Sequence, residues 1–267
     1  MLKADYENKV AHVVGIDAFN ISSGGGLTHL CEFISAIKND DYRVKEIILW
    51  GSSKVLAKVP DRKFLQKIYV PALDKGLHIR LLWHVFMFKA IAEKAKCDVV
   101  FAPGGTDLSG FNPSVTMSRN MLPFEKDEAD RYRSFFMRVK FFLLRKSWKI
   151  SYKRTNGLIF LTKYAGKIIS RKKNIYLPSG TKIVPHGVDA RFFNSDTHLT
   201  RKDFTFNSPC RLIYVSIVDP YKHHWNVVHA VGSLRASGIP VVLDLVGPPG
   251  ESLDRLKSAI HLVDPTN

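Results

Sequence analysis

The sequence predicts an α/β protein with a doubly wound, Rossmann-like first domain and the incomplete start of a second domain of the same kind. Three observations predict this fold class. Short apolar segments rich in β-branched residues alternate with segments of helical periodicity along the 267 residues. The apolar segments are hydrophobic on both faces, which is typical of parallel strands buried in a sheet. A strand, a turn and a helix follow one another from residue 11, and the same succession begins again at residue 211.

The individual elements follow from periodicity and from turn and capping signals. Strands are expected at residues 11–16, 45–50, 67–70, 98–102, 114–118, 157–161, 181–184, 211–216 and 241–246. Helices are expected at residues 27–38, 79–96, 131–154, from Lys163 with Thr162 as its cap, 225–237 and 252–262. We expect domains at residues 1–195 and 210–267, because the polar segment 196–209 has no periodicity and is typical of a linker.

The composition excludes several classes of protein. Hydrophobic residues make up 45% of the chain and charged residues 24%, which excludes a disordered chain, a collagen and a small disulfide-rich scaffold. No apolar run approaches the roughly 18–20 residues that a membrane-spanning helix needs, and the first residues lack the apolar core of a signal peptide. The three cysteines are far apart and form no CxxC pair, which indicates a reducing compartment. We therefore expect a cytoplasmic protein.

The positive charge of the chain is concentrated in one region. The chain has 40 Lys and Arg against 24 Asp and Glu, a formal net charge of +16. No acidic residue occurs between Arg131 and Val188, whereas 15 basic residues do. A partner of this region should be anionic: a membrane surface, a nucleic acid or a phosphorylated substrate. The helix expected at 131–154 mixes these cations with aromatic residues. It is either a solvated charged face or an interfacial helix that holds the protein on the inner face of the plasma membrane.

A first candidate binding segment is Gly24, Gly25 and Gly26, which we call the glycine loop. It lies between the first strand and the first helix, where glycines allow a ligand to approach the backbone and the helix N-terminus favours a phosphate. The loop does not fit the Rossmann dinucleotide fingerprint, which would need a small residue at His29, nor a Walker A motif. The alternative interpretation is a tight turn without a ligand.

Two further segments follow strands in the same way. The first, residues 184–193 (VPHGVDARFF), places His186 at the end of a strand, where open α/β sheets bind ligands. A loop histidine without a ligand is the alternative. The other, residues 214–224 (YVSIVDPYKHH), has Lys222 at the expected start of a helix, where its ammonium group and the backbone N–H groups can hold a diphosphate. The adjacent His223 and His224 do not predict a metal site, because neighbouring side chains on a helix do not converge on one ion.

In this order and spacing, the three segments resemble the GT-B glycosyltransferases, specifically the retaining enzymes of family 4 (group 1). That family has a Gly-Gly loop after its first strand and a Pro-Asn/His-Gly-Val-Asp-x-x-x-Phe segment at the end of its first domain. Its second domain opens with a strand and a Gly-Arg-x-x-x-x-Lys-Gly turn. The corresponding residues are the glycine loop; Pro185, His186, Gly187, Val188, Asp189 and Phe193; and residues 216–223 (SIVDPYKH). The resemblance covers the whole chain.

The resemblance implies an activity. A sugar would be transferred with retention from a UDP- or GDP-linked donor to a glycan or lipid-linked acceptor, in cell-surface polysaccharide or lipopolysaccharide synthesis, with no cofactor and no metal. Lys222 and His186 would be the catalytic residues. Ser216, Lys222 and the glycine loop would bind the donor phosphates. The acceptor would be bound by Asn120, Arg119 and Asp107, although an ordinary turn carboxylate is the alternative for Asp107.

The sequence also departs from the family pattern. Ile217 replaces the usual Arg of the second-domain turn, and Arg119 stands where the family has a histidine. The Glu-x7-Glu motif of the second domain does not occur, so we expect a chain truncated early in that domain and inactive by itself. The alternative function is a non-catalytic Rossmann-like module that binds an anionic partner through its basic face. That partner would be a membrane lipid rather than a nucleic acid, because no recognised nucleic-acid motif is present.

Overall fold

The computed structural model describes residues 11–38, 43–189, 192–193 and 203–264. The chain divides into two compact units. The first unit contains the described residues up to Phe124 together with Val139–His186. The second unit contains Glu125–Arg138 and the described residues from Gly187 onward. Residues 196–202 of the predicted linker lie outside the described residues.

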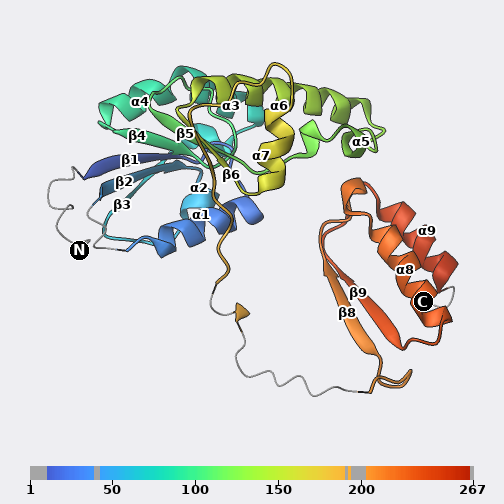
Figure 1. Ribbon diagram of the computed structural model, residues 1–267. Helices are drawn as coiled ribbons and strands as arrows, with labels where there is room; N and C mark the ends of the chain where they lie inside the picture. Colours follow the sequence, from blue (N-terminus) through green and yellow to red (C-terminus); the bar gives the residue numbers. More distant parts are fainter. Residues whose placement is uncertain (1–10, 39–42, 190–191, 194–202, 265–267) are drawn as a thin grey trace, which may run out of the picture. The chain divides into compact units, whose positions relative to one another are not determined.

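A parallel sheet of seven strands forms the centre of the first unit (Figure 1), in the order β3-β2-β1-β4-β5-β6-β7. Each strand lies within two residues of its predicted position, and the predicted doubly wound α/β fold is confirmed. The strands are β1 (His12–Asp17), β2 (Val44–Gly51), β3 (Leu65–Tyr69), β4 (Val99–Ala102), β5 (Ser114–Ser118), β6 (Gly157–Phe160) and β7 (Gly180–Ile183).

The strand order reverses at β1, which pairs with β2 on one side and with β4 on the other. Ile16 is fully buried at this position and lies in register with Leu49 of β2 and Phe101 of β4. Open α/β sheets bind ligands outside the carboxyl ends of their strands at such a switch point. The loops after β1, β4 and β5 are therefore the first place to look for a site.

Helices cover both faces of this sheet. Figure 1 shows α1 (Gly25–Ala36) on one face and α3 (Leu77–Phe86), α4 (Phe88–Lys94) and α6 (Phe135–Arg154) on the other. The first face is closed by the apolar side of α1, which buries Leu27, Leu30 and Ile34. On the other side, α6 and α7 (Lys163–Ser170) share one core cluster around Trp148 and Tyr152. Each large side chain buried in this way contributes about 1.5–3 kcal/mol.

The structure corrects two helix predictions. The helix predicted at residues 79–96 is divided into α3 and α4 at Met87. The helix predicted from residue 131 begins only at Phe135, because the chain before it closes another turn: the Arg131 N–H donates to the Glu128 carbonyl, and Tyr132 is buried. That turn ends α5 (Lys126–Ala129), which was not predicted, and neither was α2 (Ser53–Leu56). Helices of one turn leave no periodicity in a sequence.

The second unit has two parallel strands, β8 (Cys210–Val215) and β9 (Val241–Val246), with α8 (His224–Ala236) and α9 (Leu253–Val263). Both helices contribute to one apolar core, with Trp225 and Val228 from α8 and Leu256 from α9. Lys222 was predicted to open a helix, but it lies two residues before α8, in the 3-10 turn η4 (Pro220–Lys222). The reason is the left-handed backbone of His223, whose φ of 54° separates the two elements.

Candidate functional site

The glycine loop forms the N-terminus of α1. Gly24 precedes the helix with a φ of 63°, a conformation that glycine adopts without steric cost. Its carbonyl accepts the Leu27 and Thr28 N–H groups at 3.0 and 3.1 Å. No side chain caps this helix, and its first turn has no acidic residue. The N-terminus of α1 therefore carries a partial positive charge, which no acidic side chain of the first turn offsets.

Arg119 follows β5 and reaches this loop. Its guanidinium lies so close to Gly26 that a Cβ atom on that residue would stand 2.8 Å from Nη1 and 3.0 Å from Nη2. Nη1 lies 3.4 Å from the Pro103 carbonyl oxygen, at the end of β4. Arg119 forms no ion pair with the described part of the chain, and burial lowers its pKa. The structure thus brings a partly buried cation to the switch point.

Two histidines complete this group. His29 lies on α1 four residues after Gly25, and its ring centroid is 4.7 Å from that of His186, which follows β7. The Nε2 atom of His29 is buried without a hydrogen-bond partner. Burial, then the charges of His186 and Arg119, lower the pKa of His29. We call Gly26, His29, Arg119 and His186 the switch-point cluster.

Sequence reasoning singled out three members of the cluster but missed His29, which it noted only as the residue that breaks a dinucleotide fingerprint. A usable signal was its spacing. Residues four apart lie on the same face of a helix, so a histidine four residues after Gly25 faces whatever approaches the glycine loop. In the structure His29 is half-buried, so it is not a solvent-exposed histidine of the helix surface.

The other two predicted acceptor residues lie differently. Asn120 is exposed beside Arg119, and its Oδ1 accepts the Leu122 N–H at 3.0 Å. Asp107 is 3% exposed, and its Oδ1 accepts both the N–H and the hydroxyl of Ser109 at 3.0 and 2.7 Å. The contacts of Asp107 are therefore internal, and the structure does not bring this carboxylate into the switch-point cluster.

A buried histidine that the sequence did not single out supports the switch point. His84 of α3 is fully buried, and its Nδ1 lies 2.9 Å from Oδ2 of Asp17 at the end of β1. Its Nε2 accepts the Leu108 N–H at 2.9 Å, so the proton of the neutral ring lies on Nδ1 and faces Asp17. The histidine thereby ties the end of β1 to the segment after β4.

In the second unit, the predicted donor residues lie after β8. The N–H of Ser216 donates to the Val246 carbonyl at 2.9 Å, and Ser216 lines a hollow of about 230 Å³ at the carboxyl ends of both strands. The carbonyl of Lys222 accepts the Tyr214 hydroxyl at 2.7 Å, which fixes the turn η4. Its ammonium lies over the Tyr221 ring at 4.8 Å and forms no ion pair with the residues that the structure describes. Lys222 does not itself line the hollow.

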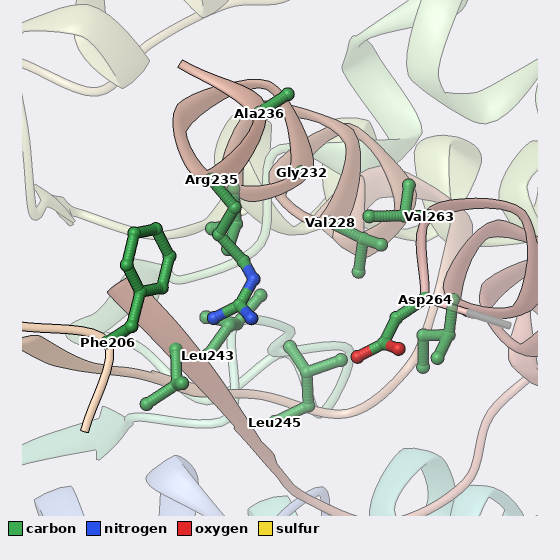
Figure 2. Close-up of a pocket in the computed structure, with 12 residues that line it drawn as sticks. Phe206, Val228, Gly232, Arg235, Ala236, Leu243, Leu245, Val263 and Asp264 are labelled. Carbon is green, nitrogen blue, oxygen red and sulfur yellow. The ribbon is translucent and has the colours of Figure 1, made fainter. Parts of the chain in front are cut away.

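A larger cavity of about 560 Å³ lies between the strands and helices of the second unit (Figure 2). Arg235 of α8 reaches into it, but its guanidinium already donates to the Val241 carbonyl at 2.7 Å and lies 5.9 Å from the Phe206 ring. Apart from Arg235 and Asp264, the lining is apolar. The smaller hollow also has two polar side chains in its lining, Ser216 and His224, so its place at the carboxyl ends of β8 and β9, and not its polarity, favours it as a ligand site.

Within the described ranges, no three His, Cys, Asp or Glu side chains come together in a way that could hold a metal ion. None of the helices described has the length and apolar character needed to cross a membrane.

No family model and no curated protein sequence matches the chain. Among solved structures, the chain is similar to "lipopolysaccharide outer core galactosyltransferase WaaB apo form", with a TM-score of 0.52 and 12% identity over 94% of this chain and 64% of that one. It is also similar to UDP-N-acetylglucosamine 2-epimerase from Rickettsia bellii, with a TM-score of 0.45 and 15% identity over the same shares. The chain thus spans less than two thirds of either protein. The likeness to the galactosyltransferase shows that the chain has a GT-B-like fold.

Proposed function

We propose that the chain forms part of a glycosyltransferase that moves a sugar, with retention, from a UDP- or GDP-linked donor, and that the chain is inactive by itself. The acceptor is a glycan or a lipid-linked glycan of cell-surface polysaccharide or lipopolysaccharide synthesis. One observation carries the proposal: the residues that match the family motifs lie at the carboxyl ends of parallel strands. The glycine loop follows β1, His186 follows β7, and Ser216 follows β8. Ligands of open α/β sheets bind at these ends.

The donor would be held mainly by the second unit. Breaking the bond between the sugar and the diphosphate leaves negative charge on the diphosphate. A positioned cation stabilises such charge by about 2–4 kcal/mol in the transition state. Lys222 is suited to this role because its ammonium has no carboxylate partner among the described residues. It lies in η4, in the segment that follows β8, and Ser216 directly follows the same strand. The proposal needs no metal and no other cofactor.

The acceptor would be held by the first unit. In the proposal, His186 acts as the second catalytic residue by contacting the transferred sugar, and Arg119 and Asn120 bind the acceptor. Asp107 has a lesser part, since its carboxylate is already bonded to Ser109. Its remaining role would be to shape the loop after β4.

The proposal includes an anionic membrane surface as a partner. Helix α6 buries Phe141 but exposes Phe135, Phe136, Phe142 and Leu143, with exposed fractions of 73%, 83%, 52% and 58%. Arg138, Lys140 and Lys146 are exposed on the same helix. Exposed aromatic side chains among cations are typical of an interfacial helix, and a lipid-linked acceptor would be reached from such a position.

The test is nucleotide-sugar binding by the intact chain. Titration calorimetry with UDP- and GDP-sugars should show binding to the wild type and at least a tenfold loss in Lys222→Ala, because a hydrogen bond to a charged group is worth about 1.5–3 kcal/mol. Lys257→Ala, which removes an exposed lysine of α9, is the matched control and should bind as the wild type does.

If Lys222→Ala and Lys257→Ala bind the nucleotide-sugar with equal affinity, Lys222 does not hold the donor phosphates. Absence of nucleotide-sugar binding, together with binding to anionic vesicles, would instead favour the alternative function, a non-catalytic module that binds an anionic partner.

A further inference from the structure

We propose that the switch-point cluster binds a phosphate-type oxyanion, held by Arg119 and His29 beside Gly26. The inference rests on the proposed function, since the anion belongs either to the nucleotide-sugar donor or to an acceptor that itself carries a phosphate. It goes further by assigning the side chains of Arg119 and His29, beside the glycine loop, to the binding of the anion.

The first step of the argument is an uncompensated charge. A guanidinium that is partly removed from water is costly unless an anion faces it. Arg119 is half-buried, yet within the described part of the chain its guanidinium forms one hydrogen bond, a long one of 3.4 Å to the Pro103 carbonyl oxygen. No described carboxylate pairs with it. An anion bound at the guanidinium would supply the missing partner.

The second step is the surroundings of that charge. The guanidinium lies against Gly26, in the first turn of a helix that has no acidic residue in that turn. The N–H groups of Gly25 and Gly26 have no acceptor within the helix, whereas those of Leu27 and Thr28 donate to the Gly24 carbonyl. Two sources of positive potential therefore meet at one place, and an oxyanion that contacts Arg119 also lies at the positive end of α1.

The third step is the unpaired histidine. The buried Nε2 of His29 has no partner, and the ring lies against that of His186. Burial, then the charges of His186 and Arg119, lowers the pKa of His29. A bound anion would reverse this balance, because it favours protonation of His29 and so gains a second charged hydrogen-bond donor.

The fourth step distinguishes an oxyanion from a neutral sugar. Sugar hydroxyls both donate and accept hydrogen bonds, so sites for them combine donors with carboxylates or carbonyls. Two carboxylates at the carboxyl ends of neighbouring strands are engaged elsewhere: Asp17 faces His84, and Asp107 is bonded to Ser109. The side chains of the cluster are cations or potential cations. This composition suits a ligand that only accepts.

The test titrates the intact chain with inorganic phosphate, glycerol 3-phosphate and UDP, and follows the imidazole signals of His29 and His186 by NMR. Inorganic phosphate should bind and should raise the pKa of His29. Arg119→Gln should weaken phosphate binding at least tenfold. Arg171→Gln, an equal charge loss at an exposed position on the C-terminal cap of α7, should not. Equal phosphate affinities of these two variants would overturn the proposal.

The other ligands identify the source of the anion. If Arg119→Gln weakens glycerol 3-phosphate binding but not UDP binding, the site serves a phosphorylated acceptor. If it weakens UDP binding as well, the site serves the donor, and both results support an anion site. Should Arg119→Gln fail to fold, Gly26→Ala, which displaces the guanidinium, replaces it. Two results together would reject this inference and leave the proposed function standing. Lys222→Ala would lose nucleotide-sugar binding, and neither Arg119→Gln nor Gly26→Ala would change the affinity for phosphate.

Discussion

Replacing Gly26 by alanine tests the geometry of the first unit with a single methyl group. The new Cβ atom would lie 2.8 Å from Nη1 and 3.0 Å from Nη2 of Arg119. Ordinary van der Waals contact begins at 3.4 Å, so the guanidinium must retreat by about 0.6 Å or more. Because the obstructing atoms are the far end of a flexible side chain, the fold can absorb this change.

The expected effects on stability and on binding therefore differ. Alanine favours a helix over glycine by about 0.5–1 kcal/mol, which offsets the cost of moving Arg119. The free energy of unfolding should thus stay within about 1 kcal/mol of the wild type. A hydrogen bond to a charged group is worth about 1.5–3 kcal/mol, so misplacing the guanidinium should weaken phosphate binding about tenfold.

The assay pairs urea unfolding with phosphate titration, and Gly166→Ala is the control. Gly166 lies inside α7, where a Cβ atom would meet the Phe160 ring at an ordinary 3.5 Å. That variant should gain helix stability and bind phosphate as the wild type does. If Gly26→Ala keeps the wild-type affinity for phosphate, the guanidinium does not hold the anion, and the reasoning from the close approach is refuted.

Two further predictions concern pH and membranes. The folded pKa of His29 is lowered, so its contribution to stability is complete above its unfolded value near 6.5 and is lost as the pH falls through the folded value. When the pH is lowered from about 7.5 to about 5.5, the free energy of unfolding in urea should fall less in His29→Gln than in the wild type. An equal fall in both proteins would contradict this. Changing Arg138, Lys140 and Lys146 together to Gln should weaken binding to vesicles with anionic lipid about 100-fold, at about 1 kcal/mol for each cation, in a sedimentation assay at low salt. Changing Lys54, Lys63 and Lys94 to Gln removes the same charge elsewhere on the surface, and equal binding of the two triple variants would exclude α6 as the membrane contact.

The strands were predictable because burial on both faces leaves a strong local signal. The run at residues 11–16 is apolar and β-branched, and β1 occupies His12–Asp17 with Ile16 fully buried. Helix boundaries were less predictable. Residues 131–134 carry no Pro or Gly to stop a helix, yet α6 begins after them because Tyr132 is buried in a turn. That burial depends on tertiary contacts, which periodicity does not contain.

The site was predictable in part because its residues follow strands that were themselves predictable. The glycine loop and His186 follow strands, and the general rule for open α/β sheets places such residues at one edge. Their convergence with Arg119 depends on the strand order, which places β1 beside β4 and β5 although β1 lies far from both in the sequence. The pairing of His84 with Asp17 could not be predicted, because the two residues are 67 positions apart and belong to different elements.

The most direct test of the central claim is a crystal structure of the chain with a UDP- or GDP-sugar. The account predicts nucleotide density at the carboxyl ends of β8 and β9, with diphosphate oxygens within hydrogen-bond distance of the Lys222 ammonium. Density in the cavity around Arg235 instead, or a diphosphate held without Lys222, would contradict it.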